Sequence, residues 1–237
     1  FFVGGEYGID ARQLADSLQS QWENLPKDFR NAQMNVNATH DSPRLLTCFA
    51  NKGKYKYRVN PFENPDCITG KPDADTYRRV RLYLVHQFTI PGSPSIWNGD
   101  EMGMWGADDP NNRKPLWWPE YKFEPEARYN IQPGKVARDK VEFNREHYEF
   151  YRKLIALRKK YPVLMMGDIT FLPSPPKVLV YERRMGSECI TVVINAGDKV
   201  DQITLRPGVR AVDLLEGAAF SGTIQVQPLT AYVLKHL

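Results

Sequence analysis

QMNVNATHDSPR, residues 33–44, changes character halfway along its length. Apolar and polar residues alternate as far as Thr39, which is the period of a β-strand whose two faces meet different surroundings. A histidine and an aspartate, His40 and Asp41, then stand side by side, and Pro43 turns the chain. The pattern predicts a strand that ends in a polar loop. In folds built from parallel strands, such loops carry the chemistry.

The two rows of this strand are predicted to have different environments. The apolar row is expected to face covering helices and consists of Met34, Val36 and Ala38. The polar row is expected to line a barrel interior or the mouth of a pocket and consists of Asn35, Asn37, Thr39 and, by continuation, Asp41. A His-Asp pair taken alone is more often structural than catalytic, so its interpretation depends on the partners that the fold brings to it.

Helical periodicity surrounds this strand. Asp10 can cap a helix that continues to Trp22, and a nearly all-apolar helix is expected over 73–89. A third helix, over 141–161, ends in basic residues that suit the helix dipole. A second short strand is expected at 95–97. This βα series predicts parallel strands covered by helices.

Beyond Pro162 the apolar period changes from that of helices to that of strands. Short alternating runs separated by Gly, Pro or Asp occupy residues 169–172, 178–183, 189–195, 202–205, 211–215, 223–227 and 230–234. Their spacing of about ten residues is typical of an antiparallel β-sandwich. The chain is therefore expected to divide into two domains, 1–161 and 162–237.

A second polar loop is predicted at residues 105–118, which read WGADDPNNRKPLWW. It combines two carboxylates, a guanidinium and three indoles. Arginine offers a planar fork for hydroxyl groups, and aromatic faces stack against the C–H faces of sugar rings. In the alternative, purely structural interpretation, Asp109 pairs with Arg113 and the tryptophans fill a cleft. The residues alone leave the two interpretations even.

The composition argues against several classes of protein. A net charge of +4 over 237 residues, with basic and acidic residues interleaved, favours a solvated surface over a nucleic-acid groove. Three widely spaced cysteines, Cys48, Cys67 and Cys189, predict neither a disulfide framework nor a zinc site. No apolar run reaches the roughly 18 residues that a membrane span needs. There is no GxSxG, P-loop or GxGxxG motif.

The histidines carry no metal-site signal in the sequence. His40 has no second histidine at ligand spacing. His86 lies inside the apolar helix and is predicted to be a satisfied core residue, whereas His147 and His236 belong to no motif. No metal ligand is therefore predicted, and no cofactor is expected in this chain.

Two motifs carry a family resemblance: NATHDSPR at 37–44 and PGSPSIWNGDEMGMWGADDPNNRKP at 91–115. In this order and spacing they resemble the seventh and eighth barrel strands of the α-amylase family of glycoside hydrolases (family 13), especially its neopullulanase and cyclomaltodextrinase branch. The segment at 11–18 is similar to the sixth barrel helix, and the region from 162 is similar to the C-terminal sandwich. The resemblance implies an α/β fold: the C-terminal part of a TIM (β/α)8 barrel, from the sixth to the eighth helix, followed by an all-β antiparallel sandwich.

The resemblance also implies roles for four residues. Asp41 matches the third catalytic carboxylate, which stabilises the oxocarbenium-like transition state, and His40 would hydrogen-bond the same sugar. In the neopullulanase-like branch an acid and an arginine bind the next sugar on the non-reducing side, here Asp109 and Arg113. The residues interpreted as supports for this site are Arg44 and 99–101.

Two further carboxylates that the family needs have no match in this sequence. Retaining hydrolysis requires a nucleophile and a general acid about 5 Å apart, and the family places them after the fourth and fifth strands. The chain, which starts at Phe1 without a Met, is therefore expected to be the last part of a larger retaining hydrolase of α-1,4- and α-1,6-linked glucans, and inactive alone. Whether the longer enzyme binds calcium is left open.

The expected partners are an α-glucan oligosaccharide and either a second copy or the absent half of the barrel, with no nucleic acid and no membrane. Two alternatives to the enzyme remain at this stage. One is a non-catalytic carbohydrate-binding protein, favoured by the tryptophan-rich loop and the sandwich, and the other is a structural α+β protein without a ligand. The compartment is not predicted.

Overall fold

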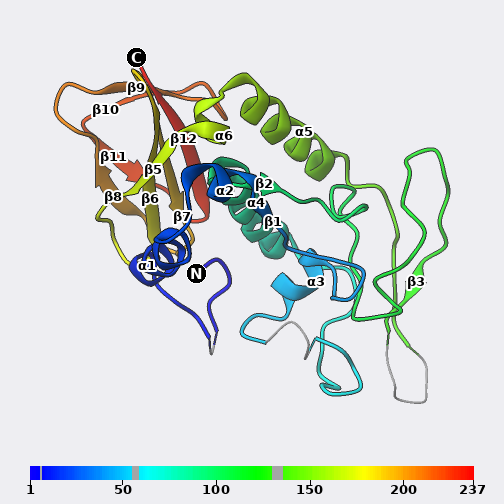
Figure 1. Cartoon of the computed structure of the whole chain (residues 1–237). Coiled ribbons are helices and arrows are strands. Elements are labelled where there is room, and N and C mark those ends of the chain that lie inside the picture. The colour runs from blue at the N-terminus through cyan, green and yellow to red at the C-terminus, as the bar shows by residue number, and fades with distance from the viewer. Residues whose placement is uncertain (6, 55–58, 130–135) are drawn as a thin grey trace.

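The computed structural model describes residues 1–5, 7–54, 59–129 and 136–237. Its helices are α1 (Ala11–Trp22), α2 (Lys27–Ala32), α3 (Leu45–Ala50), α4 (Ala74–Thr89), α5 (Arg145–Lys160) and α6 (Val163–Met166). Its strands are β1 (Met34–Asn35), β2 (Ser93–Pro94), β3 (Glu126–Ala127), β4 (Arg138–Asp139), β5 (Asp168–Phe171), β6 (Val178–Met185), β7 (Glu188–Asn195), β8 (Asp201–Thr204), β9 (Arg210–Asp213), β10 (Ala219–Ser221), β11 (Thr223–Val226) and β12 (Thr230–His236). Figure 1 shows α4 lying between the C-terminal sheet and the irregular loops that carry α3 and β3.

The three long helices form where the sequence predicts them because their first turns are capped. Asp10 accepts from the backbone N–H of Gln13 at 2.8 Å, and the Gln13 side chain accepts from the backbone N–H of Asp10 at 2.9 Å, which completes a capping box. Asp73 caps α4 and Asn144 caps α5 with a side-chain oxygen alone, which accepts from the backbone N–H of Thr76 and of His147. The predicted third helix therefore begins at its cap, later than the expected residue 141.

Three short helices were not predicted. Pro26, interpreted as the end of the first helix, also precedes the first residue of α2, because its fixed φ suits a helix start. Helices α3 and α6 follow Pro43 and Pro162 within two residues. A helix of one or two turns contains too few residues to show a periodic pattern of apolar side chains in the sequence.

The predicted parallel arrangement is present in the pair β1 and β2, although β2 lies at Ser93–Pro94 and the expected strand at 95–97 is absent. The pairing covers only Met34–Ser93 and Asn35–Pro94, so the predicted strand over 33–39 is much shorter than expected. Pro94 has no backbone N–H to donate, and Gly92 before it adopts a φ of +94°. These two residues limit the ladder.

The expected burial of the apolar row of β1 is wrong for two of its three residues. Met34 is 67% exposed and Val36 is 49% exposed, whereas Ala38 is buried. In the polar row Asn35, Asn37 and Thr39 are partly buried and Asp41 is exposed, and Asn35 donates to the carbonyl oxygen of Pro91 at 2.9 Å. No helix in the described part of the chain covers Met34 and Val36.

The C-terminal region is antiparallel, as predicted. Six strands form one sheet in the order β10-β9-β12-β7-β6-β5, and β11 pairs with β8 in a second sheet. Apolar side chains of both sheets share one core: Val178, Val180, Val193, Ile203, Leu205, Ala211, Ile224, Val226 and Leu234. Two antiparallel layers with a common core form a sandwich. In this region the sequence did not predict β10, a strand of three residues at the edge of the six-stranded sheet.

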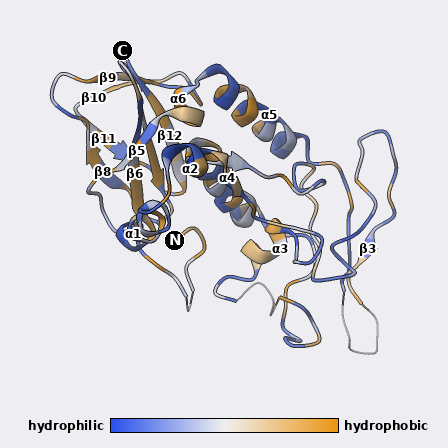
Figure 2. Cartoon of the chain, in the orientation of Figure 1, coloured by the Kyte–Doolittle hydropathy of each residue, from blue (hydrophilic) through white to orange (hydrophobic). Residues whose placement is uncertain are grey.

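The opposite face of the six-stranded sheet packs against the helices. Residues of one cluster include Leu84 and Phe88 on α4, Tyr151 on α5, and Tyr181 and Val192 on the sheet. Strands β6 and β7 are thus buried on both faces, which explains their nearly continuous apolar sequences. Figure 2 shows apolar residues on α4 and on the sheet to its left. The boundary predicted near 162 remains a prediction, since this core continues across it.

Two buried arginines connect the C-terminal end of α4 to its neighbours, one from α5 and one from β6. Arg158 of α5 donates to the carbonyl oxygens of Phe88 at 2.8 Å and Ile90 at 3.2 Å. Arg183 of β6 donates to the carbonyl oxygens of Thr89 and Leu164. Because β2 follows α4 directly, these contacts fix the point from which the second polar loop begins.

His86 is buried in the core, as predicted, but it is not a satisfied residue, because its Nδ1 has no hydrogen-bond partner among the described residues. Its ring packs between Phe2 and Tyr181, with centroid distances of 5.5 and 5.9 Å. Burial lowers the pKa of His86 to about 3. The unfolded chain takes up a proton near pH 6.5 while the folded chain does not, so this residue makes the fold less stable as pH falls from about 6.5 toward 3.

We expect the variant His86→Phe to lose this pH dependence. Its free energy of unfolding relative to wild type should rise by up to about 1.4 kcal/mol for each pH unit below 6.5. Urea unfolding of both proteins between pH 7 and pH 5 measures the difference. Comparison with wild type removes the contributions of other buried groups, including His147, whose pKa burial also lowers to about 3. Parallel stability curves for the two proteins would contradict the prediction.

Candidate functional site

The two polar loops leave adjacent strands that one glutamine holds together. Gln87 on α4 is buried, and its side-chain amide donates to the carbonyl oxygen of Asn35 at 2.8 Å and to that of Ser95 at 3.0 Å. Its own oxygen accepts from Asn37 at 3.3 Å. The exit of β1 and the exit of β2 are therefore fixed relative to each other before either loop begins.

Arg113 connects the four predicted site residues. Its Nη2 lies 3.2 Å from Oδ1 of Asp41, and its Nε lies 2.7 Å from Oδ1 of Asp109. Nε of Arg113 also donates to the carbonyl oxygen of His40 at 3.1 Å, and the His40 ring lies 3.1 Å from Oδ2 of Asp41. The structure brings together residues 72 positions apart in the chain. We refer to His40, Asp41, Asp109 and Arg113 as the Arg113 cluster.

The Arg113 cluster lies on an open surface. The side chains of His40 and Asp41 are 59% and 70% exposed, and those of Asp109 and Arg113 are about half exposed. Solvent screens the ion pairs at such positions, so their contribution to stability is small. The arrangement instead offers carboxylate acceptors and guanidinium donors to a polyhydroxylated ligand.

Asn112 is a part of the site that the sequence did not reveal. Its side-chain amide is buried and donates to the carbonyl oxygens of His40 and Ser42, both at 2.8 Å. It thereby anchors the 105–118 loop to the backbone on either side of Asp41. The only sequence signal is its place beside Arg113, because nothing in a single chain marks an asparagine as a cross-loop donor.

Arg44 and Asp100 form a buried support beneath the site, in agreement with their predicted role. Arg44 Nη1 lies 3.1 Å from Oδ1 of Asp100 and donates to the carbonyl oxygen of Asn98 at 3.1 Å. Both side chains are almost completely buried. Burial raises the pKa of Asp100, and the Arg44 guanidinium opposes that increase. The pair joins the exit of β1 to the exit of β2.

Gly99 lies against this buried pair. It adopts a φ of +99°, and a Cβ at this position would lie 2.4 Å from the sulfur of Met104 and 3.0 Å from Nη1 of Arg44. Only glycine fits both the backbone conformation and the space.

The tryptophans of the second loop divide between two roles. Trp105 and Trp117 are buried and pack edge to face with a centroid distance of 4.4 Å, so they fill the interior as the structural interpretation predicts. Lys114 lies against both rings and 2.5 Å from Glu126. Trp118 is 41% exposed and is the loop tryptophan with a free face. Among the three indoles, Trp118 therefore has the exposed face that stacking on a sugar would need.

A cavity of about 520 Å³ lies beside the second loop. Its lining includes Asn111, Lys114, Trp117, Phe123, Pro125 and Arg138. No member of the Arg113 cluster lines it. The cluster and the cavity are thus separate features of one loop.

The described helices do not meet the requirements of a membrane span. None of them combines the length and the apolar character that a bilayer span requires.

Comparison with known families assigns the class. Residues 6–167 match the family described as alpha amylase, catalytic domain, and this match covers more than half of the chain. The chain belongs to the α-amylase family. Its curated relatives include proteins named cyclomaltodextrinase and neopullulanase, the branch that the two sequence motifs indicated, and also an amylopullulanase and an α-amylase.

Three relatives illustrate the similarity. A cyclomaltodextrinase of Geobacillus thermopakistaniensis (strain MAS1) is 32% identical over 218 residues, which cover 90% of this chain and 30% of the relative. Neopullulanase 2 of Thermoactinomyces vulgaris is 27% identical over 229 residues, 94% of this chain and 31% of the relative. The solved type III pullulan hydrolase of Thermococcus kodakarensis superposes with a TM-score of 0.71 at 19% identity, over 99% of this chain and 35% of the other.

The chain spans about a third of the length of these curated relatives. The solved structure, at its low identity, supports the fold alone.

Proposed function

We propose that this chain is the C-terminal part of a retaining α-glucan hydrolase and contributes one side of its substrate cleft. In this proposal Asp41 stabilises the positive charge that develops on the sugar ring, and His40 hydrogen-bonds the same sugar. Asp109 and Arg113 bind the next sugar on the non-reducing side. The substrates are α-1,4- and α-1,6-linked glucans.

The observation that carries the proposal is the geometry of the Arg113 cluster. One guanidinium contacts both carboxylates, at 3.2 and 2.7 Å, and so fixes the separation of the two proposed sugar-binding positions. Family membership supports the same reaction class, because relatives are named cyclomaltodextrinase and neopullulanase. The proposed barrel region extends from the sixth to the eighth helix, with α1, α4 and α5 as its helices and β1 and β2 as its last strands.

Titration calorimetry with maltotriose tests the binding part of this proposal. We expect saturable heat from the 237-residue chain and none with a disaccharide that lacks α-glucosidic linkages, such as cellobiose. A chain that binds neither sugar would contradict both the hydrolase and the alternative of a non-catalytic carbohydrate-binding protein, and would leave a structural role.

The chain alone is expected to bind α-glucans without cleaving them. Retaining hydrolysis needs a nucleophile and a general acid about 5 Å apart, and the acid must lie where burial keeps it protonated. Asp41 and Asp109 are instead both exposed and both paired with Arg113. Incubation with maltohexaose or cyclodextrin followed by chromatography of the products measures turnover, and release of shorter sugars above the buffer control would overturn the expectation.

The exposed apolar row of β1 supports the proposed partner. Met34 and Val36 of this row are 67% and 49% exposed, and Phe29 on α2 is 68% exposed. Apolar residues next to a strand edge favour coverage by further protein. We propose that the remaining strands of the barrel, or a second copy of this chain, cover this face.

A further inference from the structure

Three side chains far apart in the sequence meet on one face of the C-terminal sheet. Glu182 lies on β6, Cys189 on β7 and His236 on β12, and these three strands are neighbours in the sheet. The register places Thr191 opposite both Glu182 and Leu234. Since successive side chains alternate between faces, Cys189 and His236 share the face of Thr191 and Leu234.

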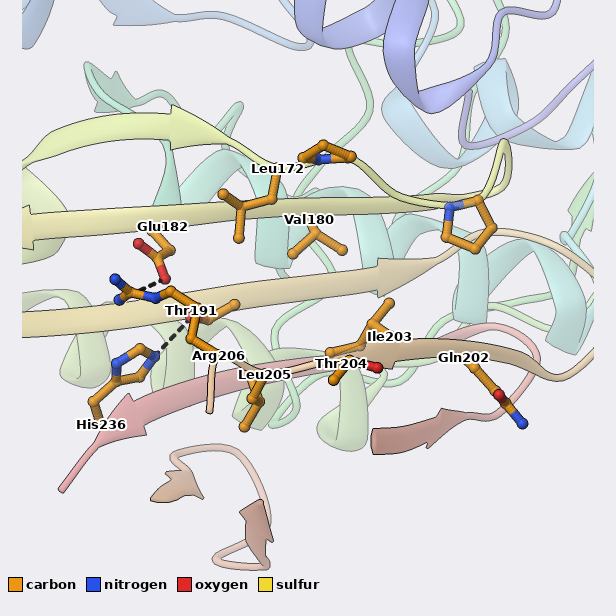
Figure 3. A pocket seen from close by; sticks show the side chains of 12 residues that line it. Leu172, Val180, Glu182, Thr191, Gln202, Ile203, Thr204, Leu205, Arg206 and His236 are labelled. Carbon is orange, nitrogen blue, oxygen red and sulfur yellow. Dashed lines mark hydrogen bonds and ion pairs between the residues drawn. The ribbon is translucent and has the colours of Figure 1, made fainter. Parts of the chain in front are cut away.

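The ligand atoms of these residues are already close together. Carboxylate, thiol and imidazole atoms of Glu182, Cys189 and His236 all lie within 4.8 Å of one another. Sγ of Cys189 lies 3.8 Å from Nε2 of His236, and Thr191 Oγ1 lies 2.8 Å from the same nitrogen. Figure 3 shows Glu182, Thr191 and His236 converging at one end of a cavity. The strands fix the three backbones, and an ion bound to Nε2 of His236 would displace the Thr191 hydroxyl from that nitrogen.

The chemistry of the three groups selects the type of ion. Thiolate, imidazole and carboxylate together suit zinc, whereas calcium and magnesium prefer oxygen ligands alone. Bonds of about 2.3 Å to sulfur and about 2.0 Å to nitrogen hold those two atoms about 3.5 Å apart at the tetrahedral angle. The observed sulfur-to-nitrogen distance of 3.8 Å is close to this requirement.

We propose that Glu182, Cys189 and His236 form a zinc-binding site, with its fourth position open to the adjoining cavity. The cavity has a volume of about 370 Å³, and its lining includes Glu182, Thr191, His236 and Arg206. A water molecule or a small ligand can complete the tetrahedron from that side. The site belongs to the sandwich, and the Arg113 cluster has no part in it.

Metal binding at these residues is coupled to proton release. Burial lowers the pKa of His236. Burial raises the pKa of Cys189 to about 11, so its thiol is protonated in the absence of metal. Coordination therefore releases the thiol proton to solvent as the sulfur–zinc bond forms.

Two arginines compete for the carboxylate. Arg184 contacts Oε2 of Glu182 at 2.9 Å, and Arg206 contacts Oε1 at 3.1 Å. A carboxylate offers about four acceptor positions, so Oε1 keeps one for the ion. The arginine charges are 40% and 57% exposed and partly screened, but they weaken cation binding. Binding should consequently be weaker than at a closed site of four protein ligands.

Metal titration of the 237-residue chain tests the proposal. We expect calorimetry to show one zinc ion bound per chain, and cobalt(II) to give a near-ultraviolet thiolate charge-transfer band. Zinc should also raise the temperature of thermal unfolding. Cys189→Ser should abolish the band and the thermal shift, while the matched control Cys67→Ser should keep both.

The variant His236→Gln provides a second test that does not alter the thiol. Far-ultraviolet circular dichroism shows whether this variant is folded. Its affinity for zinc should be at least tenfold lower than that of wild type. Absence of saturable zinc binding to wild type overturns the proposal. So does a cobalt band that persists in Cys189→Ser, or full zinc affinity in a folded His236→Gln.

Discussion

Replacement of Arg44 by alanine is expected to lower the free energy of unfolding by about 3–5 kcal/mol, because it leaves the Asp100 carboxylate buried without its partner. The two side chains are 1% and 2% exposed, and Asp100 has no other ion pair among the described residues. Arg44→Ala also removes the donor to the carbonyl oxygen of Asn98. Chemical denaturation at pH 7 measures the loss.

The matched control is an ion pair on the surface. Lys153 lies 3.0 Å from Glu216 with 40% and 79% exposure, and Lys153→Ala should cost less than about 1 kcal/mol. The double variant Arg44→Met with Asp100→Leu should recover much of the stability, since it removes both charges together. Equal losses for Arg44→Ala and Lys153→Ala would show that the buried pair has no special role.

Arg113→Ala is expected to weaken maltotriose binding by roughly 10- to 150-fold, which corresponds to about 1.5–3 kcal/mol for a charge-assisted hydrogen bond. The substitution removes the group that holds Asp41 and Asp109 at a fixed separation. Stability should change little, since the ion pairs involved are exposed. Titration calorimetry at constant ionic strength measures the affinity.

Arg152→Ala is the control for that measurement. Arg152 is also an exposed arginine in an ion pair, 3.0 Å from Glu149, but it lies on α5 and has no contact with the Arg113 cluster. Its loss should leave maltotriose affinity unchanged. An Arg113→Ala variant that binds maltotriose as well as wild type would refute the proposed sugar-binding role of the Arg113 cluster.

Local chemistry made the helices and most of the sandwich predictable. Asp10, Asp73 and Asn144 each lie immediately before an apolar helical pattern, and each caps the helix that follows. In the strands beyond Pro162, apolar residues recur at every second position between turn residues. This pattern is visible in each segment by itself, without knowledge of the strand that pairs with it. The motif around His40 and Asp41 likewise identified the α-amylase family.

Burial of β1 could not be predicted from its own residues. Alternation at Met34, Val36 and Ala38 predicts two different faces, but it does not say which face another element will cover. The structure covers Ala38 and leaves Met34 and Val36 exposed. The same limit applies to the tryptophans, because Trp105 and Trp118 have the same side chain and differ only in what surrounds them.

The sequence by itself predicted the family, the three long helices and the antiparallel strands, and it named the four residues of the Arg113 cluster as site candidates, because these depend on short-range patterns and motifs. The residues that anchor the loops of the Arg113 cluster, and the proposed zinc site, depend on contacts between residues far apart in the chain. Asn112 reaches His40 across 72 positions, and Cys189 meets His236 across 47. Such distances are fixed by strand register and loop packing, which only the folded chain defines.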